Sequence, residues 1–353
     1  MTEILPGIFQ VILTDNTVEQ GVSNISIYII PGKEGVHEGR SLMIDTGFKT
    51  ESCLKQLNDA LAALSIDIRK LDIFLTHRHH DHCGLAGIFA GMGAVLYMNP
   101  EEERHPYDCL AYRLSEKSLD AQKKVLLSVG VSPVCTPEIW KTFMEVSESA
   151  RKDGDWMLAI VGFPYRAVKA GDEFFYGEYH FKAFALKGHT YGQMGLEEKD
   201  RKIFFSADQL IAGITPIVAT TYADEGLLQG FFDSLTILKN SCADWTVIPS
   251  HGSIVGNVPA ETDRIVYSYL DKATKVRDFL KTAGKPVTVR EVSESIYRIR
   301  KTPDNESSFF LYKMMMTKTF SMLEYLRDIG FAERTLTEGV YYWTKETDRT
   351  DDK

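Results

Sequence analysis

The chain has 353 residues, a formal net charge of −9 at pH 7 and five cysteines. Its length exceeds one typical domain, and its acidic balance argues against a general nucleic-acid binder. No stretch of about 18 apolar residues predicts a membrane span. The N-terminus lacks the pattern of a secretion signal and the cysteines have no paired spacing, so we expect a cytoplasmic protein.

A short, apolar, branched run at 71–75 is typical of a buried strand, and a histidine-rich segment follows it directly. The segment reads Thr76-His77-Arg78-His79-His80-Asp81-His82. In an extended chain His77 and His79 point the same way, whereas His82 joins them only if a helix begins after Asp81. His80 has the opposite parity, so we expect it to face packing or solvent. The alternative is a surface tract that binds metal adventitiously.

Three later strand-like runs, at 181–186, 203–206 and 245–249, also end beside candidate metal ligands. These ligands are His189 within Gly188-His189-Thr190, Asp208 within Ser206-Ala207-Asp208, and His251 within Ser250-His251-Gly252. Each of them alone would more often be a turn residue or a satisfied core residue. Loops on a rigid sheet can converge on one point, so together with the histidine-rich segment they predict a metal site.

With Ile44-Asp45-Thr46-Gly47 upstream, these motifs stand in an order and spacing that resemble the metallo-β-lactamase superfamily of metal-dependent hydrolases, over about residues 5–256. The segments at 5–11 and 23–28 are similar to the first two strands of that family. The resemblance implies an α+β fold, an αββα metallo-β-lactamase sandwich. One departure is Gly84-Leu85, where the family often has two glycines, and it concerns backbone packing only.

The resemblance also implies a ligand set for two divalent ions. One ion would be held by His77, His79 and His189, the second by Asp81, His82 and His251, with Asp208 as the bridge. Five imidazoles and two carboxylates make zinc the first choice, with iron or manganese as alternatives. The candidate catalytic carboxylates are Asp81 and Asp45. For Asp45 we expect either a role in orienting a ligand histidine or, equally, an Asx-turn at the Asp45-Thr46-Gly47 corner.

The chain is expected to divide into a catalytic domain at 1–258 and a C-terminal domain at 259–353 that is similar to a winged helix. Helical periodicity at about 99–165 predicts an insertion that lines the substrate cleft or forms an oligomer contact, so a homodimer is an option. From residue 286 to 353 there are 11 Lys/Arg and 12 Asp/Glu, a balance of −1. Phosphate-reading modules are usually basic, which favours a packing or dimerisation role.

By resemblance, the expected activity is a dinuclear hydrolase in which a metal-bridging hydroxide attacks an ester, thioester or lactone carbonyl of a small molecule. Glyoxalase II-like thioester hydrolysis is the nearest named activity. The alternative is phosphodiester cleavage, as in an endoribonuclease branch of the superfamily, although the charge does not favour a nucleic-acid partner. An iron-containing oxidoreductase or a non-catalytic protein on the same fold is less consistent with the sequence, because no flavodoxin-like segment is present and all seven predicted ligands are.

Overall fold

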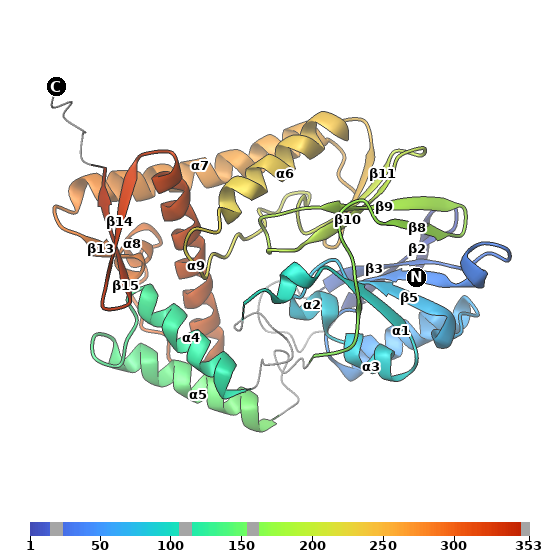
Figure 1. Ribbon diagram of the computed structural model, residues 1–353, viewed down its shortest axis with the longest axis horizontal. Coiled ribbons are helices and arrows are strands. Elements are labelled where there is room, and N and C mark those ends of the chain that lie inside the picture. The colour runs from blue at the N-terminus through green and yellow to red at the C-terminus, as the bar shows by residue number, and fades with distance from the viewer. Residues whose placement is uncertain (15–23, 106–114, 154–161, 347–353) are drawn as a thin grey trace.

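The computed structural model describes residues 1–14, 24–105, 115–153 and 162–346. Within these ranges two large β-sheets lie face to face between outer helices (Figure 1). The first has the strand order β1-β2-β3-β4-β5-β6-β7, with the bounds β1 (Thr2–Leu5), β2 (Ile8–Thr14), β3 (Asn24–Ile30), β4 (Ser41–Ile44), β5 (Leu71–Phe74), β6 (Val95–Met98) and β7 (Arg166–Ala167). The second has the order β12-β11-β10-β9-β8, with the bounds β8 (Glu173–Tyr176), β9 (Tyr179–Ala185), β10 (Met194–Glu198), β11 (Ile203–Ala207) and β12 (Thr246–Pro249).

Strand direction decides where the loops with the predicted ligands meet. β4 pairs with β5 in parallel, and β11 pairs with β12 in parallel. β10 pairs antiparallel with both β9 and β11. Parallel neighbours end at the same edge of a sheet. The segments that follow β4 and β5 therefore leave together from the first sheet, and those that follow β11 and β12 leave together from the second.

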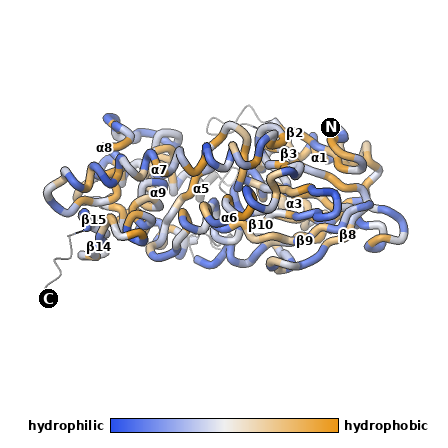
Figure 2. Tube along the Cα trace, turned by 90° about the horizontal axis from the view of Figure 1, so that it is seen from above, coloured by the Kyte–Doolittle hydropathy of each residue, from blue (hydrophilic) through white to orange (hydrophobic). Residues whose placement is uncertain are grey.

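Helices cover the outer faces of both sheets. In Figure 1, α1 (Glu51–Ala63) and α3 (Ala86–Gly91) lie on the first sheet, and α6 (Leu227–Ser241) and α7 (Val258–Thr282) lie on the second. The start of α1 is capped by Thr50, whose side chain accepts a hydrogen bond from the N–H of Cys53. Viewed from above, apolar stretches run through the interior and hydrophilic ones mark the periphery (Figure 2). The predicted α+β fold with two sheets between helices is confirmed.

The space between the sheets is filled by apolar side chains from both inner faces. Phe74 of the first sheet and Phe181, Phe205 and Ile248 of the second belong to one buried cluster, and each is at most 2 % exposed. Along β9 buried and exposed positions alternate, as expected for a strand with one face toward the core. This packing fixes the two sheets against each other and so fixes the distance between the loops at their common edge.

The C-terminal region continues from α7 into a small sheet and two further helices. Its order is β13 (Val287–Thr288), α8 (Val289–Ile296), α9 (Glu306–Asp328), β14 (Ala332–Thr337) and β15 (Val340–Lys345). The three strands pair in the order β13-β15-β14. The turn into α8 is fixed by a capping box, in which Thr288 and Glu291 exchange hydrogen bonds. None of the described helices, α7 and α9 included, is long and apolar enough to cross a membrane.

The predicted helical insertion contains α4 (Glu116–Ser128) and α5 (Pro137–Asp153), while 106–114 and 154–161 lie outside the described residues. Its buried residues, including Leu126 and Phe143, share one hydrophobic cluster with Phe231 of α6 and Phe320 of α9. Figure 1 shows α4 and α5 beside α9. The expected boundary between residues 258 and 259 lies at the first residue pair of α7. Buried residues from both sides of it belong to this one cluster.

A buried ionic network anchors the amino end of β5, opposite the end that leads to the histidines. Asp72 is fully buried, and its carboxylate accepts hydrogen bonds from the hydroxyl of Tyr176 at 2.6 Å and from Nε of Arg40 at 2.8 Å. His37 Nε2 lies 3.0 Å from the same carboxylate. The network joins β5 to β8 and to the segment before β4, so it holds the two sheets together at this end.

Substitution Asp72→Ala is expected to destabilise the fold strongly, because it leaves the Tyr176 hydroxyl and the Arg40 guanidinium without their acceptor. Loss of one partner of a buried ion pair costs about 3–5 kcal/mol, and we expect the lower end since Arg40 is partly exposed. Urea denaturation followed by circular dichroism measures the change. Asp59→Ala, which removes the exposed Lys55–Asp59 pair, is the matched control. Equal midpoints for the two variants would contradict this account.

Candidate metal centre

The seven predicted ligand side chains come from four loops and meet at one edge of the two sheets. These loops follow β5, β9, β11 and β12, and the side chains are His77, His79, Asp81, His82, His189, Asp208 and His251. The chain turns after β5 into the short helix α2 (His80–Cys83), which begins two residues earlier than predicted, and this turn brings His82 back toward His77. His80 lies outside the group, and its ring packs against Phe48.

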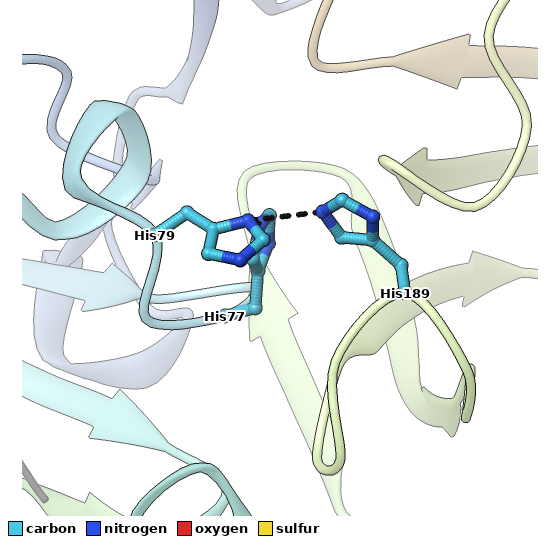
Figure 3. Close-up of side chains that lie close together, drawn as sticks. All are labelled: His77, His79 and His189. Carbon is cyan, nitrogen blue, oxygen red and sulfur yellow. Dashed lines mark hydrogen bonds between the residues drawn. The ribbon is translucent and has the colours of Figure 1, made fainter. Parts of the chain in front are cut away.

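The first cluster consists of His77, His79 and His189. Nδ1 of His79 lies 2.9 Å from Nε2 of His77 and 3.0 Å from Nε2 of His189. Figure 3 shows the three rings turned toward one another, with His189 reaching across from the second sheet. Nitrogens at these distances need a proton or a cation between them, because facing lone pairs repel. The arrangement matches three imidazole ligands of one ion.

The second cluster consists of Asp81, His82 and His251. Oδ2 of Asp81 lies 3.2 Å from Nε2 of His251 and 3.6 Å from Nε2 of His82. Asp208 lies between the two clusters, since its Oδ2 is 3.6 Å from Nε2 of His189 and 3.5 Å from Nε2 of His251. One carboxylate thus reaches both groups of ligands.

Two atoms of the site are buried without a hydrogen-bond partner, namely Nε2 of His82 and Oδ1 of Asp208. An unpaired buried polar atom costs free energy, so such atoms in a well-packed protein need an explanation such as an ion. The donor set of imidazole and carboxylate suits zinc, iron and manganese. The residues present therefore fit two divalent ions.

In three of the histidines, Nδ1 points away from the site and donates a hydrogen bond to a fixed acceptor. Nδ1 of His189 lies 2.7 Å from the carbonyl oxygen of Ile217, and Nδ1 of His251 lies 2.8 Å from that of Asn24. A carbonyl oxygen only accepts, so both Nδ1 atoms carry the proton. In the neutral ring Nε2 then bears the lone pair, and it faces the site as a metal ligand must.

Asp45 holds the third of these histidines. Its Oδ2 lies 2.8 Å from Nδ1 of His82, and its carboxylate also accepts from the N–H of Thr76 at 2.8 Å. Asp45 itself has a φ of 63°, which forms a left-handed corner after β4. Of the two roles expected from the sequence, the geometry supports orientation of a ligand histidine, because the carboxylate bonds His82 and Thr76 and not the backbone of the Asp45-Thr46-Gly47 corner.

Electrostatics differ between the two clusters. Burial lowers the pKa of His77 and His79, and the surrounding imidazoles lower it further, so both rings are neutral. Burial also opposes charge on His82, yet the carboxylates of Asp81 and Asp208 outweigh it and raise the pKa of that ring. The same attraction lowers the pKa of Asp81 against the effect of burial. The carboxylates therefore stay ionised, and they also raise the pKa of His251, so the second cluster favours positive charge at its imidazole nitrogens.

Glu102, in the short helix η3 (Pro100–Glu103), was not predicted from the sequence, yet it joins two of the ligand loops. It is fully buried, and burial raises its pKa. One carboxylate oxygen accepts from the Thr190 hydroxyl at 2.5 Å and from the N–H of Gly192 at 2.6 Å. The other accepts from the N–H of Arg78 at 2.9 Å. Glu102 thus holds the loop of His77 and His79 beside the loop of His189.

The backbone at Gly188 brings the His189 loop unusually close to α6. Gly188 has a φ of 134°, and a Cβ at this position would lie 2.3 Å from Cβ of Phe231. No other residue fits both that conformation and that space. The glycine in Gly188-His189-Thr190 therefore sets how deeply His189 sits in the site.

Comparison with known proteins places this geometry in a family. The family model described as the metallo-beta-lactamase superfamily matches residues 21–277. Among solved structures, a metallo-beta-lactamase family protein from Thermus thermophilus is 19 % identical, with 98 % of this chain and 100 % of that chain covered and a TM-score of 0.75. A beta-lactamase domain protein from Burkholderia ambifaria is 18 % identical, with 98 % and 94 % covered and the same TM-score.

Both structural matches extend over the C-terminal region, so the fold of the whole chain, not only that of the sandwich, recurs in these proteins. The search of curated proteins gives no match. The family model covers well over half of the chain and includes the four loops that carry the histidines and aspartates. The chain therefore belongs to the metallo-beta-lactamase superfamily of metal-dependent hydrolases.

Proposed function

We propose that the protein is a dinuclear hydrolase of small acyl substrates, an ester, thioester or lactone. The observation that carries the proposal is the convergence of imidazole lone pairs and ionised carboxylates on two adjacent points, with Nε2 of His82 and Oδ1 of Asp208 left without protein partners. Two divalent ions there, zinc by preference, would polarise the carbonyl oxygen and lower the pKa of a shared water to near neutrality.

The ligand assignment follows the two clusters. His77, His79 and His189 would hold one ion and Asp81, His82 and His251 the other, while Asp208, which also groups with His77 and His82, would contribute to both. Asp45 keeps His82 aimed at its ion through the 2.8 Å contact with Nδ1. Because the Asp81 side chain is 15 % exposed and stays ionised, it is also suited to accept a hydrogen bond from the substrate.

A thioesterase activity of the glyoxalase II type remains the nearest named reaction within this class. Reducing conditions in the cytoplasm would suit it, and the described cysteines, Cys53, Cys83, Cys135 and Cys242, form no disulfide. We also propose that the region from β13 to β15 is a winged-helix-like module, since two helices lead into a hairpin that pairs with a short third strand. Its extensive packing against α4, α5 and α7 supports a structural role.

Phosphodiester cleavage is the second candidate, and one observation favours it. Lys313 of α9 lies near enough to Arg78 that the charge of Arg78 adds to burial in lowering the pKa of Lys313 to about 8. Arg78 itself stands between the ligands His77 and His79. Nε of Arg78 lies 4.0 Å from the carboxylate of Glu102, so the charge of Lys313 is the one that would suit an anionic substrate.

Protein purified without chelators is expected to contain about two equivalents of a divalent metal, and His189→Ala and His251→Ala are each expected to retain about one. Inductively coupled plasma mass spectrometry gives the stoichiometry. His180→Ala is the control, because His180 lies on β9 of the same sheet with a half-exposed side chain, outside the clusters. Loss of metal in this control, or full loading in both ligand variants, would show that the clusters are not the binding sites.

A substrate panel separates the two candidate functions. We expect kcat/KM for the best thioester or lactone to exceed that for bis-p-nitrophenyl phosphate by about 100-fold or more, which corresponds to about 2.7 kcal/mol in transition-state stabilisation. His79→Ala should abolish turnover of the preferred substrate. A clear preference for the phosphodiester would support the second candidate and refute the first, and full activity of His79→Ala would refute both.

Glu102→Gln is expected to weaken metal binding, because an amide cannot accept hydrogen bonds at both ends and would place its NH₂ against a backbone N–H. Loss of such an outer partner typically lowers metal affinity about 10–100-fold. Competition with a chromophoric chelator measures the dissociation constants. The control is Glu101→Gln, an exposed neighbour in the same short helix. If both variants bind metal like the unmodified protein, Glu102 does not set the spacing of the loops.

A further inference from the structure

The acceptor that fixes His189 lies in a segment with little regular structure of its own. Ile217, whose carbonyl oxygen holds Nδ1 of His189 at 2.7 Å, belongs to the stretch 215–220, which is neither helix nor strand. A flexible acceptor would not fix the tautomer or the direction of the imidazole. The position of Ile217 must therefore be determined by contacts from elsewhere in the fold.

Tyr269 of α7 supplies two of these contacts, one on each side of Ile217. Its hydroxyl donates to the carbonyl oxygen of Pro216 at 2.8 Å and accepts from the N–H of Val218 at 2.7 Å. The side chain is fully buried, and its ring packs edge-to-face against Phe231 and Phe232. Burial raises the pKa of Tyr269, so the hydroxyl keeps the proton that it donates.

Residues of α7 and α9 make further hydrogen bonds to the segment around Ile217. On α7, the guanidinium of Arg264 donates to the carbonyl oxygen of Ile214 at 2.6 Å and to the hydroxyl of Thr215 at 3.1 Å. On α9, the carbonyl oxygen of Thr317 accepts from the N–H of Thr220 at 3.2 Å. The segment 214–220 is thus attached at both ends and in the middle to helices that begin after residue 257.

We propose that Tyr269 is a positioning residue for the metal centre. By holding the peptide groups on both sides of Ile217, it fixes the Nδ1–H tautomer of His189 and the direction of Nε2, so the region after residue 257 completes the active site. The part of this inference that concerns metal affinity rests on the proposed function. The part that concerns the tautomer of His189 does not depend on it.

The test compares Tyr269→Phe with Tyr312→Phe in the full-length protein. Both substitutions remove one buried hydroxyl and keep the ring. The hydroxyl of buried Tyr312 donates to Glu294 at 2.6 Å, within the C-terminal region and not to the backbone of 214–220. A similar fall in melting temperature is therefore expected for the two variants, and only a role at His189 would distinguish them.

Two readouts are needed. In long-range ¹H–¹⁵N spectra of the chelator-treated protein, assigned with His189→Ala, we expect the Nδ1–H tautomer in the unmodified protein and in Tyr312→Phe, but a mixture in Tyr269→Phe. In zinc competition we expect Tyr269→Phe to weaken one of two sites by up to about tenfold, the lower end of the effect of outer partners, because the hydroxyl acts through Ile217.

An unchanged His189 tautomer in Tyr269→Phe would overturn the inference, whatever the metal content. An unchanged zinc affinity together with a shifted tautomer would overturn its second half, that the region after residue 257 completes the metal centre. If the unmodified protein bound no divalent ion, the proposed function would fail, while the tautomer comparison would still decide the role of Tyr269.

Discussion

The metal centre requires that five imidazoles and two carboxylates be packed together in a largely buried space. Each of these groups would be better solvated outside the protein, and several of their atoms point at one another with no protein group between them. The free energy for this arrangement comes from the sandwich, whose apolar core holds the two sheets in place. A rigid frame of this kind also favours tight binding of cations, because the ligands need no reorganisation when an ion arrives.

The groups behind the ligands matter as much as the ligands themselves. The carboxylate of Asp45 and the carbonyl oxygens of Asn24 and Ile217 each take the proton on the far side of one histidine. Asn24 begins β3 of the first sheet, whereas Ile217 lies near the helices on the second. The orientation of the imidazoles is therefore shared among distant parts of the chain, and none of the ligand loops is autonomous.

The fold class and the ligand set could be predicted because the motifs that carry the resemblance to the metallo-β-lactamase superfamily are local in sequence. Histidines at fixed spacing after a strand, and a glycine before His189, are visible without knowing the fold. The role of Glu102 was not visible, since it stands in an acidic run that resembles an ordinary solvated turn and its partners Thr190 and Gly192 are about 90 residues away.

The contacts of Tyr269 were hidden for the same physical reason. A tyrosine on an amphipathic helix predicts burial, but not which backbone groups its hydroxyl will meet. Likewise the composition of the insertion and of the C-terminal region suggested separate pieces, and only the structure shows Phe143 and Phe320 in a common core. Long-range hydrogen bonds and shared cores depend on the tertiary arrangement, which local patterns do not specify.

The shared core has a consequence for how this protein can diverge. Consider a chimera with a related enzyme in which the crossover falls between the sandwich and α7. Its native 214–220 segment would meet a foreign helix, and the loss of these contacts would misplace His189, which is far from the crossover in sequence. Recombination is best tolerated where exchanged blocks keep their contacts intact, so the segment and its supporting helices are expected to be inherited as one unit. Substrate range can then change through the remaining loops while the supports of His189 stay constant.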